Sequence, residues 1–216
     1  MLKTVIFDLD GTIGDTLPLC VKAFQQAIEP LGGIRLTPQE VIAHFGPSEE
    51  GVIRELFPDR YEEATELFIN SYRELHDIAP RPFEGIVELL SYLKSAGVHN
   101  TIVTGKGMRT LRITLDKYGI APYFDLLEAG SPEGPCKSEK ICKILSALAV
   151  APEEALYVGD APTDIAESRA AGVPVASAAW ASTAEPELLE QMNPGMVFPS
   201  VASLTAYLEE RLSDRK

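Results

Sequence analysis

The beginning of the chain is the feature that most restricts how it can fold. Val5-Ile6-Phe7 is a β-branched and aromatic run, and it ends abruptly at the acidic segment Asp8-Leu9-Asp10-Gly11-Thr12. A short apolar run without polar alternation is typical of a strand buried on both faces of a parallel sheet. Reactive groups in open α/β sheets lie beyond the carboxyl ends of such strands. The first twelve residues therefore predict a central strand and an acidic segment at its functional end.

Strand and helix patterns alternate after Pro80-Arg81-Pro82. We predict strands near 101–103, 124–128, 155–158 and 173–176, and helices near 86–97, 108–118, 141–148 and 165–171. Alternation of this kind is typical of an α/β fold with a doubly wound parallel sheet that is covered by helices.

A different pattern separates the first strand from this alternating part. Between about residues 16 and 79, helical segments are punctuated by prolines, and Thr37-Pro38 is a typical helix start. From Asp59 to His76, apolar residues recur at a spacing of three to four, which predicts one buried helix face. We therefore expect a small all-helical cap domain at 15–80, inserted into a core formed by 1–14 and 81–216.

Charge and cysteine content exclude several functions. The chain has 19 basic and 32 acidic residues and a net charge of −13, so it lacks the clustered cations that nucleic-acid binding requires. Its three cysteines form no C-x-x-C pair, which argues against a disulfide framework or a thiolate zinc site and favours a reducing cytosol. Neither a signal peptide nor a membrane-spanning stretch of about 20 apolar residues is evident. We expect a cytoplasmic protein without a membrane or nucleic-acid partner, either a monomer or a homodimer.

Polar residues follow three predicted strands and precede one helix, where a site is expected. Uncompensated carboxylates at one sheet edge would repel one another, and an all-oxygen ligand set suits Mg²⁺ together with a substrate phosphate. The sequence thus predicts a magnesium phosphate site formed by Asp8 and Asp10, Thr104 and Gly105, Lys137, Asp160 and Asp164.

The order and type of these motifs resemble the haloacid dehalogenase superfamily, over nearly the whole chain. Within it, they look most like phosphatases that carry a helical C1-type cap after the first motif, in particular the phosphoglycolate phosphatase group. The matching motifs are Asp8 to Thr12, the end of Ile102-Val103-Thr104-Gly105, Lys137, and Gly159-Asp160-Ala161-Pro162-Thr163-Asp164.

The resemblance implies a role for each matched residue. Asp8 would be the nucleophile that forms an aspartyl-phosphate, and Asp10 the general acid and base. Thr104, Gly105 and Lys137 would bind the phosphoryl group. Mg²⁺ would be held by Asp8, by the main-chain carbonyl of Asp10 and by Asp160. Asp164 would orient a metal-bound water or Lys137.

The third motif and the cap depart from a simple match. Ser138 follows Lys137 where proline is common, and Lys140 is a rival that we place within the helix. The turn at 45–48 is expected to face the site, with Arg54 as the first cation to test, although pairing of Arg54 with Glu50 is favoured. Residues 14–83 contain six basic and twelve acidic residues, whereas a highly anionic substrate would require a more basic cap.

The predicted function is Mg²⁺-dependent hydrolysis of a small phosphorylated metabolite. Halide displacement is disfavoured because it needs neither a leaving-group acid such as Asp10 nor a metal. A phosphosugar mutase remains an alternative, since no residue shows whether the aspartyl-phosphate persists. A non-hydrolytic phosphoacceptor or binding module is a further alternative. Asp10 is the residue that distinguishes a hydrolase from such a module.

Overall fold

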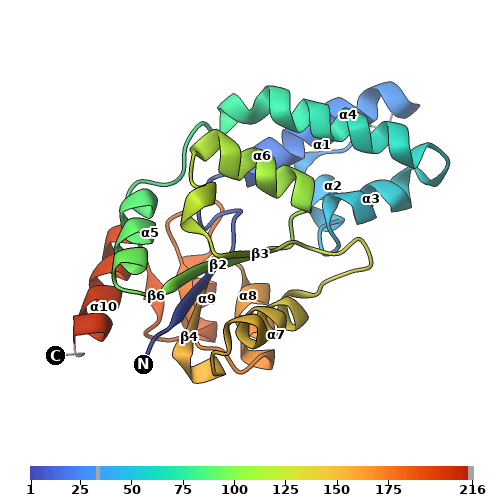
Figure 1. The fold of residues 1–216 in the computed structure, drawn as a ribbon. Helices are drawn as coiled ribbons and strands as arrows, with labels where there is room; N and C mark the ends of the chain where they lie inside the picture. Colours follow the sequence, from blue (N-terminus) through green and yellow to red (C-terminus); the bar gives the residue numbers. More distant parts are fainter. Residues whose placement is uncertain (33–34, 214–216) are drawn as a thin grey trace.

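Six parallel strands form one sheet in the computed structural model, which describes residues 1–32 and 35–213 (Figure 1). This arrangement confirms the predicted doubly wound α/β fold. From one edge to the other, the strands are β3 (Leu126–Glu128), β2 (His99–Val103), β1 (Thr4–Phe7), β4 (Ala155–Gly159), β5 (Val175–Ala178) and β6 (Val197–Phe198).

β1 lies between β2 and β4, and its side chains alternate between two hydrophobic layers. Val5 and Phe7 join the cluster on one face of the sheet, whereas Ile6 joins the cluster on the other. All three side chains are fully buried, as expected for a strand that is covered on both faces.

Three helices pack on each face of the sheet and contribute aliphatic side chains to its cluster. Short segments between strands and helices leave the carboxyl ends of the strands pointing toward one edge of the core (Figure 1). On one face lie α5 (Ile86–Ser95), α6 (Met108–Tyr118) and α10 (Val201–Ser213), and on the other α7 (Lys137–Leu148), α8 (Pro162–Ala170) and α9 (Pro186–Met192).

The last strands differ from the prediction. The strand expected at 173–176 begins two residues later, as Val175–Ala178, after Gly172 adopts a left-handed conformation with φ of 74°. β6 was not predicted, because a strand of two residues carries no detectable periodicity. It pairs with β5 through Ser177 and Ala178 and completes the sheet.

Residues 17–32 and 35–78 contribute the helices that lie above the carboxyl edge of the sheet, as Figure 1 shows. The predicted start at Thr37 is confirmed, because Thr37 and Glu40 form a reciprocal capping box. The elements are α1 (Leu17–Gly32), α2 (Pro38–Ala43), α3 (Glu49–Leu56), α4 (Tyr61–Glu74), and short 3₁₀ turns at Pro58–Arg60 and Leu75–Ile78.

These helices share a hydrophobic cluster that is separate from the two clusters flanking the sheet. At its centre, the ring centroids of Phe24 and Phe68 are 4.4 Å apart. We call residues 15–80 the helical insert and propose on this packing that they form a domain of their own, with 1–14 and 81–216 as the core domain. Five residues of these ranges, 33–34 and 214–216, lie outside the described part of the chain. None of the described helices is long and apolar enough to cross a membrane.

Candidate active site

Three carboxylates converge where the strand order reverses. Asp8 directly follows β1, Asp160 directly follows the neighbouring strand β4, and Asp164 lies in the first turn of α8. Each offers a carboxylate oxygen within 4.8 Å of the others. The carboxyl ends of adjacent strands at this point form the usual ligand crevice of a doubly wound sheet.

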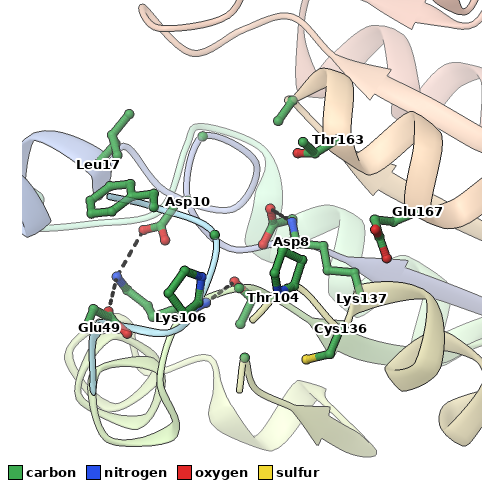
Figure 2. A pocket seen from close by; sticks show the side chains of 18 of the residues that line it. Asp8, Asp10, Leu17, Glu49, Thr104, Lys106, Cys136, Lys137, Thr163 and Glu167 are labelled. Atoms are coloured by element: carbon green, nitrogen blue, oxygen red, sulfur yellow. Dashed lines mark hydrogen bonds and ion pairs between the residues drawn. The ribbon is translucent and has the colours of Figure 1, made fainter. Parts of the chain in front are cut away.

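Lys137 is the cation of this cluster. It is the first residue of α7, and its Nζ lies 2.6 Å from Asp8 Oδ2 and 2.5 Å from Asp164 Oδ1. Figure 2 shows Lys137 next to Asp8. The rival Lys140 instead pairs with Glu128, 3.3 Å away. The geometry thus brings Lys137 into the cluster, and the contact with Asp164 supports the expectation that Asp164 orients it.

Backbone geometry holds the acidic side chains in place. The amide of Leu9 donates to Asp8 Oδ1 at 2.7 Å, and the amide of Ala161 donates to Asp164 Oδ2 at 3.0 Å. Gly11 has a φ of 73°, and a Cβ at this position would overlap the Asp160 carboxylate. A side chain at Gly11 would therefore disturb the site both through its backbone and through its volume.

The ionisation of the cluster reflects its burial. Desolvation raises the pKa of Asp8 to about 6, although Lys137 opposes this shift. Desolvation, together with the negative charges of Asp8 and Asp164, raises the pKa of Asp160 to about 8. Burial by itself lowers the pKa of Lys137, but the carboxylates of Asp164 and Asp8 outweigh it and raise this pKa well above the usual value. The cluster holds more negative charge than Lys137 neutralises.

The residues present fit a hard divalent cation. The donors are carboxylate oxygens, and the three carboxylates carry more negative charge than Lys137 neutralises, so a further positive charge would be stabilised there. The geometric cluster contains Asp164 and not the carboxylate of Asp10, whose expected contribution was a main-chain carbonyl. The ligand set of Asp8, Asp10 and Asp160 therefore stays a prediction.

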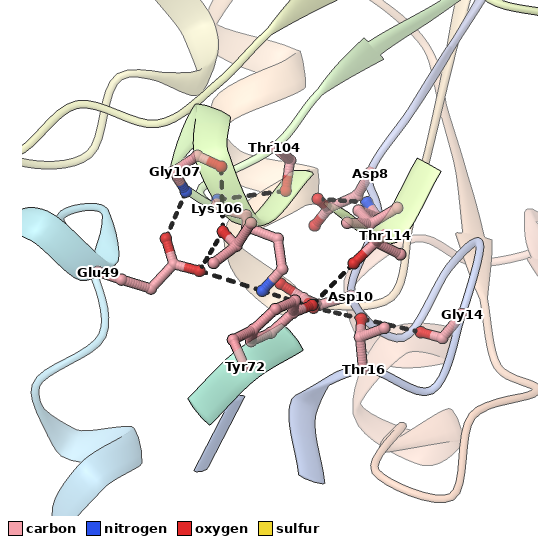
Figure 3. A network of polar contacts seen from close by, with 12 residues as sticks. Asp8, Asp10, Gly14, Thr16, Glu49, Tyr72, Thr104, Lys106, Gly107 and Thr114 are labelled. Carbon is pink, nitrogen blue, oxygen red and sulfur yellow. Dashed lines mark hydrogen bonds and ion pairs between the residues drawn. The ribbon is translucent and has the colours of Figure 1, made fainter. Parts of the chain in front are cut away.

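The carboxylate of Asp10 belongs to a second network (Figure 3). Asp10 Oδ1 accepts a hydrogen bond from Thr16 and lies 3.3 Å from Lys106 Nζ. Lys106 is buried, and its Nζ is also 3.1 Å from Glu49 Oε1 and lies over the Tyr72 ring. The network joins the first loop, the segment after β2 and the helical insert.

Glu49 belongs to this network as well, and the sequence analysis did not identify it as a site residue. It is the first residue of α3, and its carboxylate accepts hydrogen bonds from the Gly107 amide and, at 2.8 Å, from the Thr110 hydroxyl. The only available signal was its position next to the turn at 45–48, which was expected to face the site.

Thr104 and Gly105 lie at the end of β2, as expected. Thr104 is buried, and its hydroxyl accepts a hydrogen bond of 3.3 Å from the Lys106 amide. Gly105 approaches the Lys137 side chain, since a Cβ built on Gly105 would be 3.9 Å from Lys137 Cε. Both residues line the same cavity as Asp8 and Lys137.

A cavity of about 390 Å³ lies between the core and the helical insert. Phe45, Gly46 and Pro47 line it, so the turn faces the site as expected. Arg54 does not line it: its guanidinium pairs with Glu133 at 3.0 Å and donates to the Pro132 carbonyl at 2.8 Å. The prediction that Arg54 pairs with Glu50 was wrong, because α3 packs against the segment before α7 and brings Glu133 within reach of Arg54.

A doubly wound sheet with an aspartate cluster and a lysine at its switch point, covered by a helical insert, defines a class of α/β enzymes. The family of haloacid dehalogenase-like hydrolases matches residues 5–178, and the chain belongs to this family. Since that family consists of hydrolases, the protein is an enzyme of this type.

Similar proteins agree with this assignment. The chain is 30% identical over 205 residues to the pyrophosphatase PpaX of Halalkalibacterium halodurans, covering 94% of this chain and 95% of the relative. It is 30% identical over 182 residues to the phosphoglycolate phosphatase of Aquifex aeolicus, covering 83% of this chain and 85% of the relative. The crystal structure of a predicted phosphoglycolate phosphatase from Haemophilus somnus has the same fold, with a TM-score of 0.80 and 21% sequence identity. The match covers 96% of this chain and 98% of that protein.

Proposed function

We propose that the protein is a Mg²⁺-dependent phosphomonoester hydrolase that works through an aspartyl-phosphate on Asp8. The observation that carries this proposal is the position of Asp8 within 2.6 Å of Lys137 and in one cluster with Asp160 and Asp164. A nucleophilic carboxylate next to a fixed cation suits attack on a phosphoryl group, whose oxygens carry negative charge. Relatives named as phosphatase and pyrophosphatase support it.

In the first half of the reaction, a carboxylate oxygen of Asp8 attacks phosphorus, and the bond between phosphorus and the ester oxygen breaks. Asp10 gives its proton to the departing oxygen, so an alcohol leaves and an aspartyl-phosphate remains. Lys137, Thr104 and Gly105 bind the phosphoryl oxygens in this proposal. All five residues line the cavity, which supports these roles.

In the second half, Asp10 removes a proton from the water that attacks phosphorus. The bond between phosphorus and Asp8 breaks, inorganic phosphate forms, and both aspartates return to their initial state. Asp164 keeps Lys137 in place, which their 2.5 Å contact supports.

Asp8, the main-chain carbonyl of Asp10, and Asp160 would hold Mg²⁺. When bound, the ion supplies positive charge that neutralises the phosphoryl group and the carboxylates. The proposed substrate is a small phosphorylated metabolite, because the cavity is small. We place the enzyme in the cytosol, as a monomer or a homodimer; its three free cysteines are consistent with a reducing compartment.

The proposal is tested by phosphate release from a panel of phosphomonoesters and pyrophosphate, with Mg²⁺ or with a chelator. We expect Mg²⁺-dependent release that disappears in Asp8→Asn, and activity retained in that variant would refute the proposal. A mutase would release little phosphate and isomerise a sugar phosphate. A phosphoacceptor would accumulate phospho-Asp8 without turnover.

A further inference from the structure

Among the described residues, none that the helical insert contributes to the wall of the cavity carries a positive charge. The described residues that the insert contributes are mostly apolar, and Glu49 is the charged one among them. Arg54, the first cation to test for this position, lies outside the cavity and pairs with Glu133. The residues from the insert that line the cavity are Leu17, Cys20, Phe45, Gly46, Pro47 and Glu49.

Both lysines that line the cavity come from the core, and each already contacts two carboxylates. Lys137 lies between Asp8 and Asp164. Lys106 Nζ lies 3.3 Å from Asp10 Oδ1 and 3.1 Å from Glu49 Oε1. Dashed lines in Figure 2 mark these two ion pairs. Lys137 contacts the proposed nucleophile Asp8, and in the proposed function it binds the phosphoryl group. Lys106 is therefore the lysine on the Asp10 side of the cavity, and its charge is already balanced.

Glu49 is a fixed negative charge. Its side chain is only 6% exposed, and it is held by the Lys106 ammonium, the Gly107 amide and the Thr110 hydroxyl. Moving this carboxylate aside would leave the buried ammonium of Lys106 and the two other donors with one partner fewer, which is unfavourable in a buried site. An anionic group next to Lys106 would thus meet the negative charge of Glu49.

We propose that the substrate is a phosphomonoester whose leaving group is an uncharged alcohol, an inference that rests on the proposed function. Glu49 excludes leaving groups that carry a carboxylate or a second phosphate. Asp10 protonates the departing oxygen, so the organic part of the substrate lies on the Asp10 and Lys106 side. A like charge in a poorly hydrated cavity raises the free energy of the bound state. The apolar side chains of the insert favour an uncharged group there.

Two pairs of esters of similar size test this inference. In each pair a carboxylate replaces a hydroxymethyl group: 2-phosphoglycolate against 2-hydroxyethyl phosphate, and 3-phosphoglycerate against glycerol 3-phosphate. We expect kcat/KM of the wild type to favour the uncharged member by about tenfold or more, as expected for one unit charge in a partly buried site. Pyrophosphate should also be a poor substrate.

The variant Glu49→Gln removes the charge, and Glu55→Gln is a matched control at an exposed position of the same helix. The ratio of the two kcat/KM values is independent of the fraction of folded enzyme. We expect Glu49→Gln to shift this ratio toward the carboxylate-bearing ester by about five- to tenfold, and Glu55→Gln to leave it unchanged.

Higher kcat/KM for the anionic esters or for pyrophosphate would overturn the inference, as would an unchanged ratio in Glu49→Gln. In either result, the hydrolysis itself would still support the proposed function. If no phosphomonoester were hydrolysed by the wild type, the proposed function would fail, and this inference with it.

Discussion

The ammonium of Lys137 lies 2.6 Å from Oδ2 of Asp8, although the two residues are 129 positions apart in the chain. This contact places a partly buried cation against the proposed nucleophile, at the boundary between β1 and β4. Lys137 neutralises part of the charge of the aspartate cluster, and in the proposed mechanism it binds the phosphoryl group. The first prediction concerns this lysine.

Lys137→Met should lower kcat/KM for phosphomonoesters by about 10²–10³-fold, since a preorganised charge that stabilises a transferring group has an effect of this size. Lys140→Met is the matched control on the same helix, because Lys140 pairs with Glu128 outside the cluster and should change activity less than about twofold. Steady-state kinetics at saturating Mg²⁺ measures both. Equal losses in the two variants would contradict the proposed role of Lys137.

The stability of the metal-free protein should depend on pH through Asp160. A carboxyl whose pKa is higher in the folded state, here about 8 against an ordinary value of 3.8, stabilises the fold at low pH, and this contribution is lost as the pH rises through the folded pKa. In a chelator, the melting temperature should therefore fall between about pH 6 and pH 8, above the folded pKa of Asp8 and below that of Asp160, and it should level off above about pH 8. Added Mg²⁺ should raise it most at the alkaline end, where the carboxylates are ionised.

Asp160→Asn provides the control for this pH dependence. Its melting temperature should be nearly flat over the same range and should respond weakly to Mg²⁺. A wild-type melting temperature that rises with pH in the presence of the chelator would show that Asp160 is ionised well below neutral pH in the folded protein.

Gly11→Ala should impair the site, because its φ is 73° and the new Cβ would overlap the Asp160 carboxylate. We expect a loss of about 10²-fold in kcat/KM, as for small displacements of catalytic groups. Gly97 has the same φ of 73° but open space around it. Gly97→Ala should therefore cost about 1–2 kcal/mol of stability and leave kcat/KM unchanged, and comparable activity in the two variants would argue against the Asp160 contact.

Phe68→Ala should destabilise the helical insert. Phe68 is 1% exposed and packs against Phe24 in the centre of the insert's cluster, so its truncation should cost about 3–5 kcal/mol in the free energy of unfolding. Ile42, which is 43% exposed, is the control, and Ile42→Ala should change this free energy by less than about 0.5 kcal/mol. Urea unfolding followed by circular dichroism measures both values.

Local patterns were sufficient for most of the fold. The apolar run at β1 and the alternation after residue 80 predicted the sheet, because the side-chain periods of strands and helices are visible in short windows. β6 was missed, since two residues do not establish a period. Thr37 was identified as a helix start because a capping box depends only on residues three positions apart.

The chemical groups at the strand ends could be read directly from the residues. Because parallel strands share one carboxyl edge, Asp8, Thr104 and Asp160 had to come near one another once the strands were identified. The way in which the helical insert meets this edge became visible in the folded protein alone. Glu49 contacts Lys106 across 57 positions, and Arg54 contacts Glu133 across 79. No local period encodes such contacts, because they depend on how one hydrophobic cluster packs above another.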